Sequence, residues 1–267
     1  KKRKEDGVAH LKIGIELAGL RLPARQALAA AARLGADAVE LDARGDFAPG
    51  NFSQTGLRQL RKTLDDLRLR VCAVSFRTRR GFSAPADLEP RIEAAKAAIE
   101  LAARLAARSV ITRIGQIAGK NRPADNRLLV EVLSDLAHFG NRAGAFLAAE
   151  TGEQPVADLA QLFEQLPEGI IGIDLNTGNL AANGHSSLEA VESLGPRILH
   201  VHATDGVCDP GRRRGERVEL GSGTADFPAL LGALAEVGYR GYYTIQPAAG
   251  GDARAEAARA IEYLRKF

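Results

Sequence analysis

The chain has 267 residues, of which 45% are hydrophobic and 26% charged, and it carries a formal net charge of +3 at pH 7. This length is close to the ~250 residues of a typical eightfold barrel, and the composition is ordinary for a globular protein. No apolar run approaches the ~20 residues that span a bilayer, and the basic start Lys1–Lys4 leads into polar residues, so we expect neither a membrane protein nor a secreted one.

Short apolar strands and amphipathic helices are predicted to alternate along the chain, after a disordered basic tail at residues 1–10. The predicted strands cover residues 11–17, 38–41, 70–75, 109–113, 145–149, 170–175, 198–203 and 242–245. The predicted helices cover residues 23–34, 55–67 with Thr55 as N-cap, 87–105, 127–141, 156–166, 187–193, 227–237 with Asp226 as N-cap, and 253–267. A loop rich in glycine and arginine is expected between the strand at 198–203 and Gly223.

Eight strands that alternate with about eight helices over this length predict a single α/β domain, a (β/α)8 TIM barrel spanning residues 11–267. An open, doubly wound sheet is the alternative. It is disfavoured because Glu16-Leu17-Ala18-Gly19 follows the first strand, where that fold has a glycine-rich turn.

The segment Ile198–Asp205 carries two of the five histidines. Because side chains alternate along a strand, His200 and His202 share one face with Thr204, and the opposite face is apolar. Taken alone, the pattern is equally typical of a core strand whose histidines bond to their neighbours. In a barrel the polar face would point into a site, since active sites lie at the C-terminal ends of the strands.

Other predicted strand ends carry polar side chains with the same alternation. These residues are Glu16, Glu40, Asp42, Arg113, Glu150, Asp174, Asn176 and Gln246. Those expected to converge from the last four strands are Glu150, Asn176, His202 and Gln246. Their oxygen and nitrogen donors suit a divalent ion such as Mn²⁺ or Mg²⁺. A hydrogen-bonded polar core without a metal is the alternative.

Six short motifs stand in a characteristic order and spacing. They are Gly35-Ala36-Asp37-Ala38-Val39-Glu40-Leu41, Ala149-Glu150-Thr151-Gly152, Leu175-Asn176-Thr177-Gly178-Asn179-Leu180, His200-Val201-His202-Ala203-Thr204-Asp205, Gly221-Ser222-Gly223-Thr224-Ala225-Asp226-Phe227 and Gly238-Tyr239-Arg240-Gly241-Tyr242-Tyr243-Thr244-Ile245-Gln246. Together they resemble the xylose isomerase-like barrel superfamily, and more narrowly its sugar phosphate isomerase/epimerase branch. The resemblance covers nearly all of the chain from about Leu11.

This resemblance implies a metal site and an acid–base pair. In the family a Glu, an Asp, a His and a second Glu typically hold the metal, and the two glutamates usually also act as acid and base. The corresponding positions here are Glu150, Asn176, His202 and Gln246, and the histidine that usually follows the Asp by three residues is Asn179. A carboxamide attracts a dication less than a carboxylate does and cannot transfer a proton. We therefore expect Mn²⁺, Mg²⁺ or Zn²⁺ to be weakly bound or absent, with Asp174 as a candidate substitute ligand.

The predicted roles divide between catalysis and substrate binding. Glu150 would transfer a proton next to a carbonyl, and His202 would polarise that carbonyl. The predicted substrate-binding residues are Glu40, Arg113, His200, Asp205 and Arg217, with Asp205 placed to orient ligands or His202. Arg77, Arg79 and Arg80 are expected at the rim of the site. Guanidinium groups suit an anionic or polyhydroxylated substrate.

The leading interpretation is a cytoplasmic isomerase or epimerase that acts on a small sugar or keto-polyol. One alternative is a catalytically weakened barrel that binds a sugar-like ligand or a partner subunit, and another is a dehydratase or lyase for a keto-inositol-like substrate. An apurinic endonuclease-like activity is rejected, because few of the five histidines lie near strand ends. We expect no nucleic-acid or membrane partner, and a homo-oligomer remains open. Cys72 and Cys208 show no metal-binding spacing, as in a reduced protein.

Overall fold

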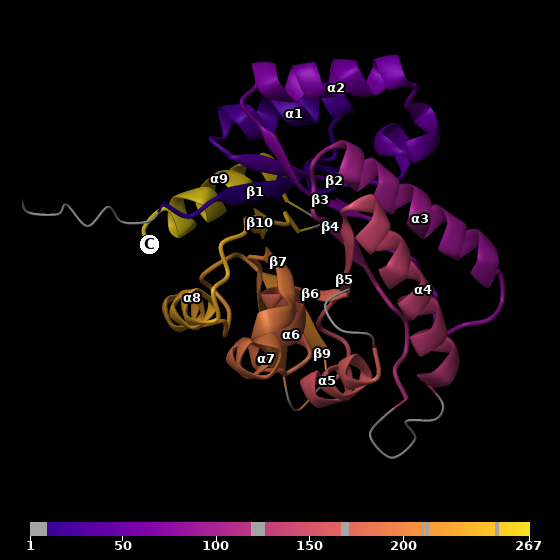
Figure 1. Ribbon diagram of the computed structural model, residues 1–267. Helices are drawn as coiled ribbons and strands as arrows, with labels where there is room; N and C mark the ends of the chain where they lie inside the picture. Colours follow the sequence, from indigo (N-terminus) through magenta and orange to yellow (C-terminus); the bar gives the residue numbers. More distant parts are fainter. Residues whose placement is uncertain (1–9, 119–125, 167–170, 210, 212–213, 249–250) are drawn as a thin grey trace, which may run out of the picture.

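A closed barrel of eight parallel strands forms the centre of the molecule (Figure 1). The computed structural model describes residues 10–118, 126–166, 171–209, 211, 214–248 and 251–267. The barrel strands are β1 (Ile13–Glu16), β2 (Ala38–Asp42), β3 (Arg70–Ser75), β4 (Ser109–Thr112), β5 (Phe146–Glu150), β6 (Gly172–Asn176), β7 (Ile198–His202) and β10 (Tyr243–Ile245). Each strand pairs with the next along the chain, and β10 closes the circle by pairing with both β7 and β1. The predicted TIM barrel is confirmed.

Helices surround this barrel and connect its strands. The α-helices are α1 (Ala24–Arg33), α2 (Gln54–Asp66), α3 (Leu88–Arg104), α4 (Arg127–Ala143), α5 (Val156–Glu164), α6 (Thr177–Ala182), α7 (Ser187–Leu194), α8 (Phe227–Glu236) and α9 (Ala253–Leu264). Short 3₁₀ helices lie at η1 (Leu17–Leu20), η2 (Gly45–Phe47), η3 (Pro49–Asn51) and η5 (Gly195–Arg197). Among the described helices, none is both long and apolar enough to pass through a lipid bilayer.

Side-chain caps explain where several helices begin. Ser53 accepts a hydrogen bond from the backbone N–H of Gly56, so α2 is capped by Ser53, and the prediction of Thr55 as the N-cap was wrong. Asp226 caps α8 as predicted, since its carboxylate accepts from the N–H of Ala229. These caps satisfy backbone donors that have no partner within the helix.

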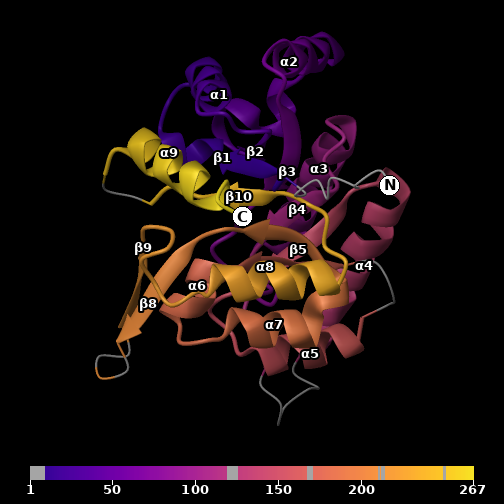
Figure 2. The same ribbon diagram turned by 90° about the vertical axis from the view of Figure 1, so that its left-hand side faces the viewer.

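An antiparallel hairpin interrupts the alternation of strands and helices after β7. Its strands β8 (Asp205–Asp209) and β9 (Arg214–Val218) pair with each other and contact α6 (Figure 2). The prediction of a loop through this stretch was therefore wrong, and α6 is a helix that was not predicted. The first strand is also shorter than predicted, because the chain turns into η1 after Glu16. The predicted tail falls almost wholly in residues 1–9, outside the described residues.

The two faces of the strands have different neighbours. Ile13 and Ile15 of β1 and Leu41 of β2 belong to the large apolar core, and each is 0% exposed. A smaller cluster of Ala73, Ile111 and Ala148 is also fully buried and separate from that core. Outward-facing residues therefore bury under helices, as expected for parallel strands covered on both sides.

Gly14 creates space beside the other strands of the barrel. A Cβ atom at this position would lie 2.7 Å from Oγ1 of Thr244 and 2.9 Å from Sγ of Cys72. Any larger residue would displace these buried groups, so the glycine allows the polar side chains of neighbouring strands to meet.

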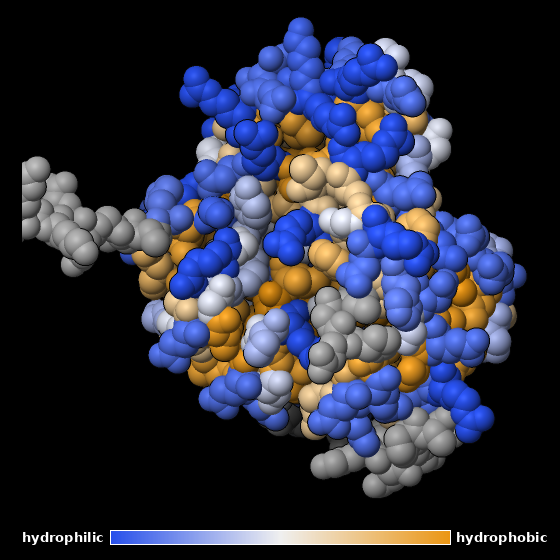
Figure 3. All heavy atoms as spheres, in the orientation of Figure 1, coloured by the Kyte–Doolittle hydropathy of each residue, from blue (hydrophilic) through white to orange (hydrophobic). Residues whose placement is uncertain are grey.

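The surface is mostly hydrophilic on the face seen in Figure 3, with smaller apolar patches between the helices. Within the described part of the chain, the exposed large hydrophobic residues are Val237 and Phe267. The distinctive chemistry of this protein therefore lies in its buried polar centre.

Candidate active site

The side chain of Arg77 lies at the centre of the polar groups that follow the strands. Its Nε is 3.2 Å from both carboxylate oxygens of Glu150, and its Nη1 donates to Oε1 of Glu16 at 2.5 Å. Its Nη2 is 3.5 Å from Oε1 of Glu40 and 3.4 Å from Nε2 of His202. All three guanidinium nitrogens thus lie against carboxylates, which come from β1, β2 and β5.

The surrounding carboxylates hold Arg77 firmly in its charged form. Burial lowers the pKa of the guanidinium, but Glu40, Glu150 and Glu16 outweigh it, so the pKa lies well above its usual range. The side chain remains 22% exposed. It is therefore a permanent cation that keeps some access to the outside of the barrel.

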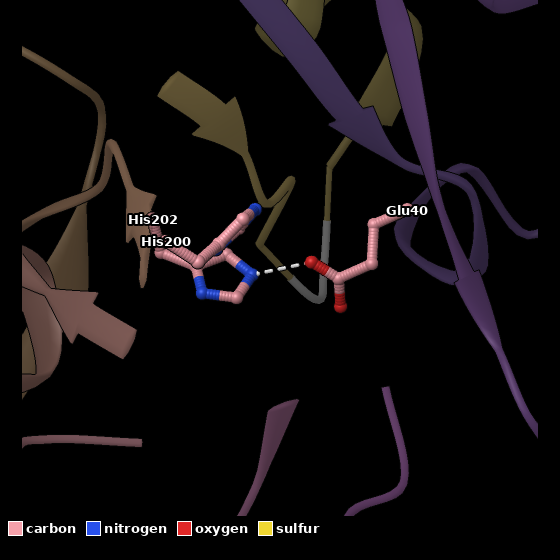
Figure 4. Close-up of side chains that lie close together, drawn as sticks. All are labelled: Glu40, His200 and His202. Atoms are coloured by element: carbon pink, nitrogen blue, oxygen red, sulfur yellow. Dashed lines mark ion pairs between the residues drawn. The ribbon is translucent and has the colours of Figure 1, made fainter. Parts of the chain in front are cut away.

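His202 bridges two buried carboxylates. Its Nδ1 is hydrogen-bonded to Oδ2 of Asp174 at 2.7 Å. Its Nε2 lies 2.8 Å from Oε2 of Glu40, the ion pair drawn in Figure 4. Burial opposes the charged ring, but Asp174 and Glu40 raise the pKa of His202 well above its ordinary value. The two carboxylates therefore favour the protonated ring, and each ring nitrogen lies beside one of them.

Asp174 and Glu40 are fully buried, and neighbouring cationic side chains keep both carboxylates ionised. Burial raises the pKa of Glu40, but His202 and Arg77 lower it by more, so that the pKa falls from 4.5 to about 2. Burial likewise opposes ionisation of Asp174, and the two histidines bring its pKa below the usual range. Among the described residues, neither oxygen of Glu40 has a partner with hydrogen-bond geometry, and the ion pairs with Arg77 and His202 compensate its charge.

His200 belongs to a deeper layer of the same network. Its Nδ1 is 2.9 Å from Oδ1 of Asp174, and its Nε2 is 2.9 Å from Oγ1 of Thr244. Sγ of Cys72 lies 3.4 Å from the same hydroxyl. His200 is 1% exposed, so it supports Asp174 from below and lies away from the mouth of the barrel.

The two carboxamides turn their nitrogen atoms toward the acidic centre. Nδ2 of Asn176 donates to Glu150 at 3.2 Å, while its oxygen accepts from the N–H of Asn179 at 3.1 Å. Nε2 of Gln246 donates to Glu16 at 3.0 Å, and its oxygen accepts from Nη1 of Arg217. A backbone N–H and a guanidinium can only donate, so these partners fix both amides in the observed orientation.

A pocket of about 370 Å³ lies beside Glu150, between the segments that follow β3, β4, β5 and β6. The polar residues that line it include Arg79, Arg80, Arg113, Glu150, Gln154 and Asn179. Arg113 donates from Nε to Glu150 at 3.3 Å, so one wall of the pocket is joined to the central carboxylate. Glu150, whose side chain is 3% exposed, connects the pocket with Arg77.

Two predicted substrate-binding residues lie in and around the β8–β9 hairpin. Arg217, on β9, reaches back to Gln246 and also donates to its backbone oxygen at 2.6 Å. The carboxylate of Asp205 accepts from the backbone N–H groups of Gly206 and Gly223, each at 2.8 Å. Asp205 thus holds the hairpin to the following turn. Direct contact of either residue with a substrate stays a prediction.

The structure brings together most residues that the sequence singled out. Glu40, Glu150, Asp174, Asn176, His200 and His202 form one continuous network. The prediction that Arg77 lies at the rim was wrong, because its side chain points to the centre. Its spacing offered a signal, since Arg77 continues the alternation of Ala73 and Ser75 beyond the end of β3.

Candidate metal donors also lie close together. One group is formed by Glu40, His200 and His202, and a second by Glu150, Asp174 and His202, with the donor atoms of each group within 4.8 Å of one another. That spacing is compatible with a metal ion. The same donors, however, already contact each other or Arg77, and the oxygens of Asn176 and Gln246 accept from other groups. They do not present a free set of ligands for a dication.

Several solved structures have the same fold as this chain. A xylose isomerase domain protein from Planctomyces limnophilus is 22% identical, with a TM-score of 0.84 over 96% of this chain and 98% of that one. A D-tagatose 3-epimerase-like protein is 21% identical, with a TM-score of 0.79 over 96% of each chain. A xylose isomerase-like TIM barrel protein from Mycobacterium smegmatis, determined in complex with magnesium, is 18% identical, with a TM-score of 0.76 over 96% of this chain and 95% of that one.

Sequence comparison gives a shorter match and a family. An uncharacterized protein from Methanocaldococcus jannaschii is 30% identical over 92 residues, which are 33% of this chain and 29% of that protein. The family model described as xylose isomerase-like TIM barrel matches residues 28–267. The chain therefore belongs to the xylose isomerase-like TIM barrel family.

Proposed function

We propose that this protein is an isomerase or epimerase that transfers a proton next to the carbonyl of a small sugar or keto-polyol. The observation that carries the proposal is the position of Glu150. Glu150 is one of the residues that line the 370 Å³ pocket, and its carboxylate contacts Arg77 and Arg113 at 3.2 and 3.3 Å. A substrate in this pocket would meet an acid–base group beside two cations.

In the proposed reaction, Glu150 takes the proton from the carbon next to the carbonyl. The C–H bond breaks, its electron pair forms the carbon–carbon double bond of an enediolate, and negative charge develops on the former carbonyl oxygen. The carboxylic acid then returns the proton to the same carbon or to the former carbonyl carbon, and in the second case the hydroxyl proton of the first carbon passes to the former carbonyl oxygen. For His202, which was predicted to polarise the carbonyl, we propose a positioning role instead, because it is fully buried and ties Glu40 and Asp174 together beneath Arg77.

Glutamine at the second acid–base position limits which stereochemical changes of the substrate the protein can catalyse. Gln246 cannot exchange a proton, so a two-base epimerisation would need another carboxylate on the opposite face of the substrate. Glu16 is the carboxylate nearest to that position, since it accepts from Gln246 at 3.0 Å. Return of the proton by Glu150 alone corresponds to isomerisation between aldose and ketose.

The substrate itself is proposed to be anionic or polyhydroxylated. Arg79 and Arg80, both exposed, line the same pocket as Arg113, and their guanidinium groups can bind a phosphate or several hydroxyls. The size of the pocket suits a small molecule of this kind.

Proton exchange in D₂O tests the function directly. The protein is incubated with ketoses, ketose phosphates and a keto-inositol, and the loss of the C–H signal next to the carbonyl is followed by proton NMR. We expect exchange with at least one of these compounds, and a loss of about 10²-fold or more in Glu150→Gln, which keeps the shape but not the base. The matched control is Glu131→Gln on the exposed side of α4, which should exchange as the wild type does.

The alternative of a catalytically weakened, sugar-binding barrel is favoured by the two carboxamides. It predicts saturable binding of one of the same compounds, measured by calorimetry, without exchange in D₂O. That result would replace the enzymatic proposal by the binding one.

A further inference from the structure

The positive charge at the centre of this site comes from the protein itself. Arg77 contacts Glu16, Glu40 and Glu150 with three different nitrogen atoms, at distances of 2.5 to 3.5 Å. A guanidinium has five N–H donors in one plane and can satisfy several carboxylates at once. This side chain therefore occupies the space among the carboxylates into which a dication would have to fit.

The orientation of the two amides is a second, independent sign that this space is not arranged for a dication. Asn176 and Gln246 stand where the family resemblance implies carboxylate ligands, and each turns an NH₂ group toward a glutamate of the centre. Their oxygens are held on the opposite side by Asn179 and Arg217. A site arranged around a dication would present oxygens inward, whereas donors face inward here.

His202 stands at another of the four ligand positions that the resemblance implies, and its two ring nitrogens are already in contact with carboxylates. Nδ1 of His202 contacts Asp174 at 2.7 Å and Nε2 contacts Glu40 at 2.8 Å. Neither nitrogen is left for a metal, and His202 is 0% exposed. Of the four positions implied by the resemblance, Glu150 alone keeps a carboxylate, and Arg77 binds both of its oxygens.

We propose that Arg77 takes the place of the divalent metal ion at this site, so that the protein works with an internal cation. The second part of this proposal rests on the proposed function: Arg77 stabilises the negative charge that develops on the substrate oxygen during proton transfer. A fixed guanidinium in a site of low water content is well suited to that task, because it needs no reorganisation when the charge appears.

The two parts of the proposal are separable in experiment. Metal binding is measured by titrating Mn²⁺ and following the free ion by electron paramagnetic resonance, which needs no activity. The wild type should bind Mn²⁺ no better than its surface does. Arg77→Ala removes the cation and leaves four buried carboxylates, Glu16, Glu40, Glu150 and Asp174, so it should bind one Mn²⁺ at least about tenfold more tightly.

Two control variants make the titration specific. Arg265→Ala removes a side chain of nearly equal exposure, 21%, from its ion pair with Asp37, and it should gain no Mn²⁺ site. Arg77→Lys keeps the charge but not the three-way fork, and it should also exclude the ion. If circular dichroism shows Arg77→Ala to be unfolded, Arg77→Ala/Glu40→Gln takes its place, since it removes one positive and one negative charge together.

The outcomes decide the proposal. A wild type that binds one Mn²⁺ as tightly as the alanine variant overturns it, and so does a folded alanine variant that gains no site. In the exchange assay, the activity of the wild type should be unchanged by EDTA. The activity of Arg77→Lys should be at least about tenfold lower than that of the wild type. Activity that requires added Mn²⁺ also overturns the proposal. Absence of all exchange removes the proposed function, and the titration still decides whether Arg77 excludes the metal.

Discussion

Replacement of Asp174 by asparagine tests the buried network most directly. Each oxygen of Asp174 binds one imidazole, at 2.9 Å for His200 and 2.7 Å for His202, and the side chain is 0% exposed. Asparagine has one accepting oxygen, so in Asp174→Asn an NH₂ group would face the N–H of one of the rings. The substitution also leaves His202 with Glu40 as its one ion-pair partner among the described residues.

The magnitude follows from these losses. A hydrogen bond to a charged group contributes about 1.5–3 kcal/mol, and breaking a buried ion pair costs about 3–5 kcal/mol. The two terms overlap, so we expect the free energy of unfolding of Asp174→Asn to be lower by about 3–5 kcal/mol. For a domain of this size, that corresponds to a decrease in Tm of roughly 6–20 °C.

The effect should depend on pH in a defined way. The pKa of Asp174 is lowered by folding, so its contribution is present above pH 3.8 and lost as pH falls. The pKa of His202 is raised by folding, so its contribution is present below pH 6.5 and lost as pH rises through the folded value. The difference between wild type and Asp174→Asn should therefore be largest between these two values.

Urea unfolding followed by circular dichroism at several pH values provides the measurement. The control is Asp226→Asn, the same chemical change at an N-cap, where asparagine caps equally well and the cost should stay within about 0.5 kcal/mol. A cost below about 1 kcal/mol for Asp174→Asn across this pH range would refute the assigned network.

Three further outcomes follow from the buried groups. Folding lowers the pKa of Glu40 from 4.5 to about 2, so the stability contributed by its ionised form is present above pH 4.5 and lost as pH falls toward 2. In urea titrations over this pH range, the free energy of unfolding of Glu40→Gln should therefore decrease less steeply with falling pH than that of the wild type. Gly14→Ala should lower the free energy of unfolding by about 1–3 kcal/mol, since its Cβ would lie 2.9 Å from the thiol of Cys72, whereas Gly232→Ala on α8, with no atom within 4 Å of the new Cβ, should be neutral or stabilising by up to about 1 kcal/mol. Burial raises the pKa of Cys72 to about 12, so a thiol-reactive dye should label the half-buried Cys208 in the folded protein and reach Cys72 only after denaturation; equal labelling rates for the two thiols would contradict this.

The alternation of residues along the strands made much of the barrel predictable. The period of two along β6 and β7 is sufficient to predict that Asp174, Asn176, His200 and His202 share the inner face. Helix ends were predicted less accurately, because Ser53 and Thr55 are both good caps and tertiary contacts choose between them. The β8–β9 hairpin was missed because its glycine and arginine residues resemble a loop in composition.

The position of Arg77 could not be derived from the sequence with the same certainty. Alternation fixes the direction in which a side chain leaves the backbone, but a long arginine can end in solvent or turn inward. Here the combined charge of Glu16, Glu40 and Glu150 determines the outcome, and these residues come from three strands that are distant in sequence. Such an arrangement becomes visible only once the barrel is closed.

The inward-facing amides also restrict the order in which this site can change during evolution. Asn176→Asp alone would place a second carboxylate against Glu150, where the amide now donates at 3.2 Å, and Gln246→Glu would do the same against Glu16 at 3.0 Å. Each reversal is unfavourable while its partners remain, since like charges would meet in a buried space. The amides and the acids that they contact are therefore coupled, and neighbouring positions would have to change together for carboxylates to be tolerated at 176 and 246.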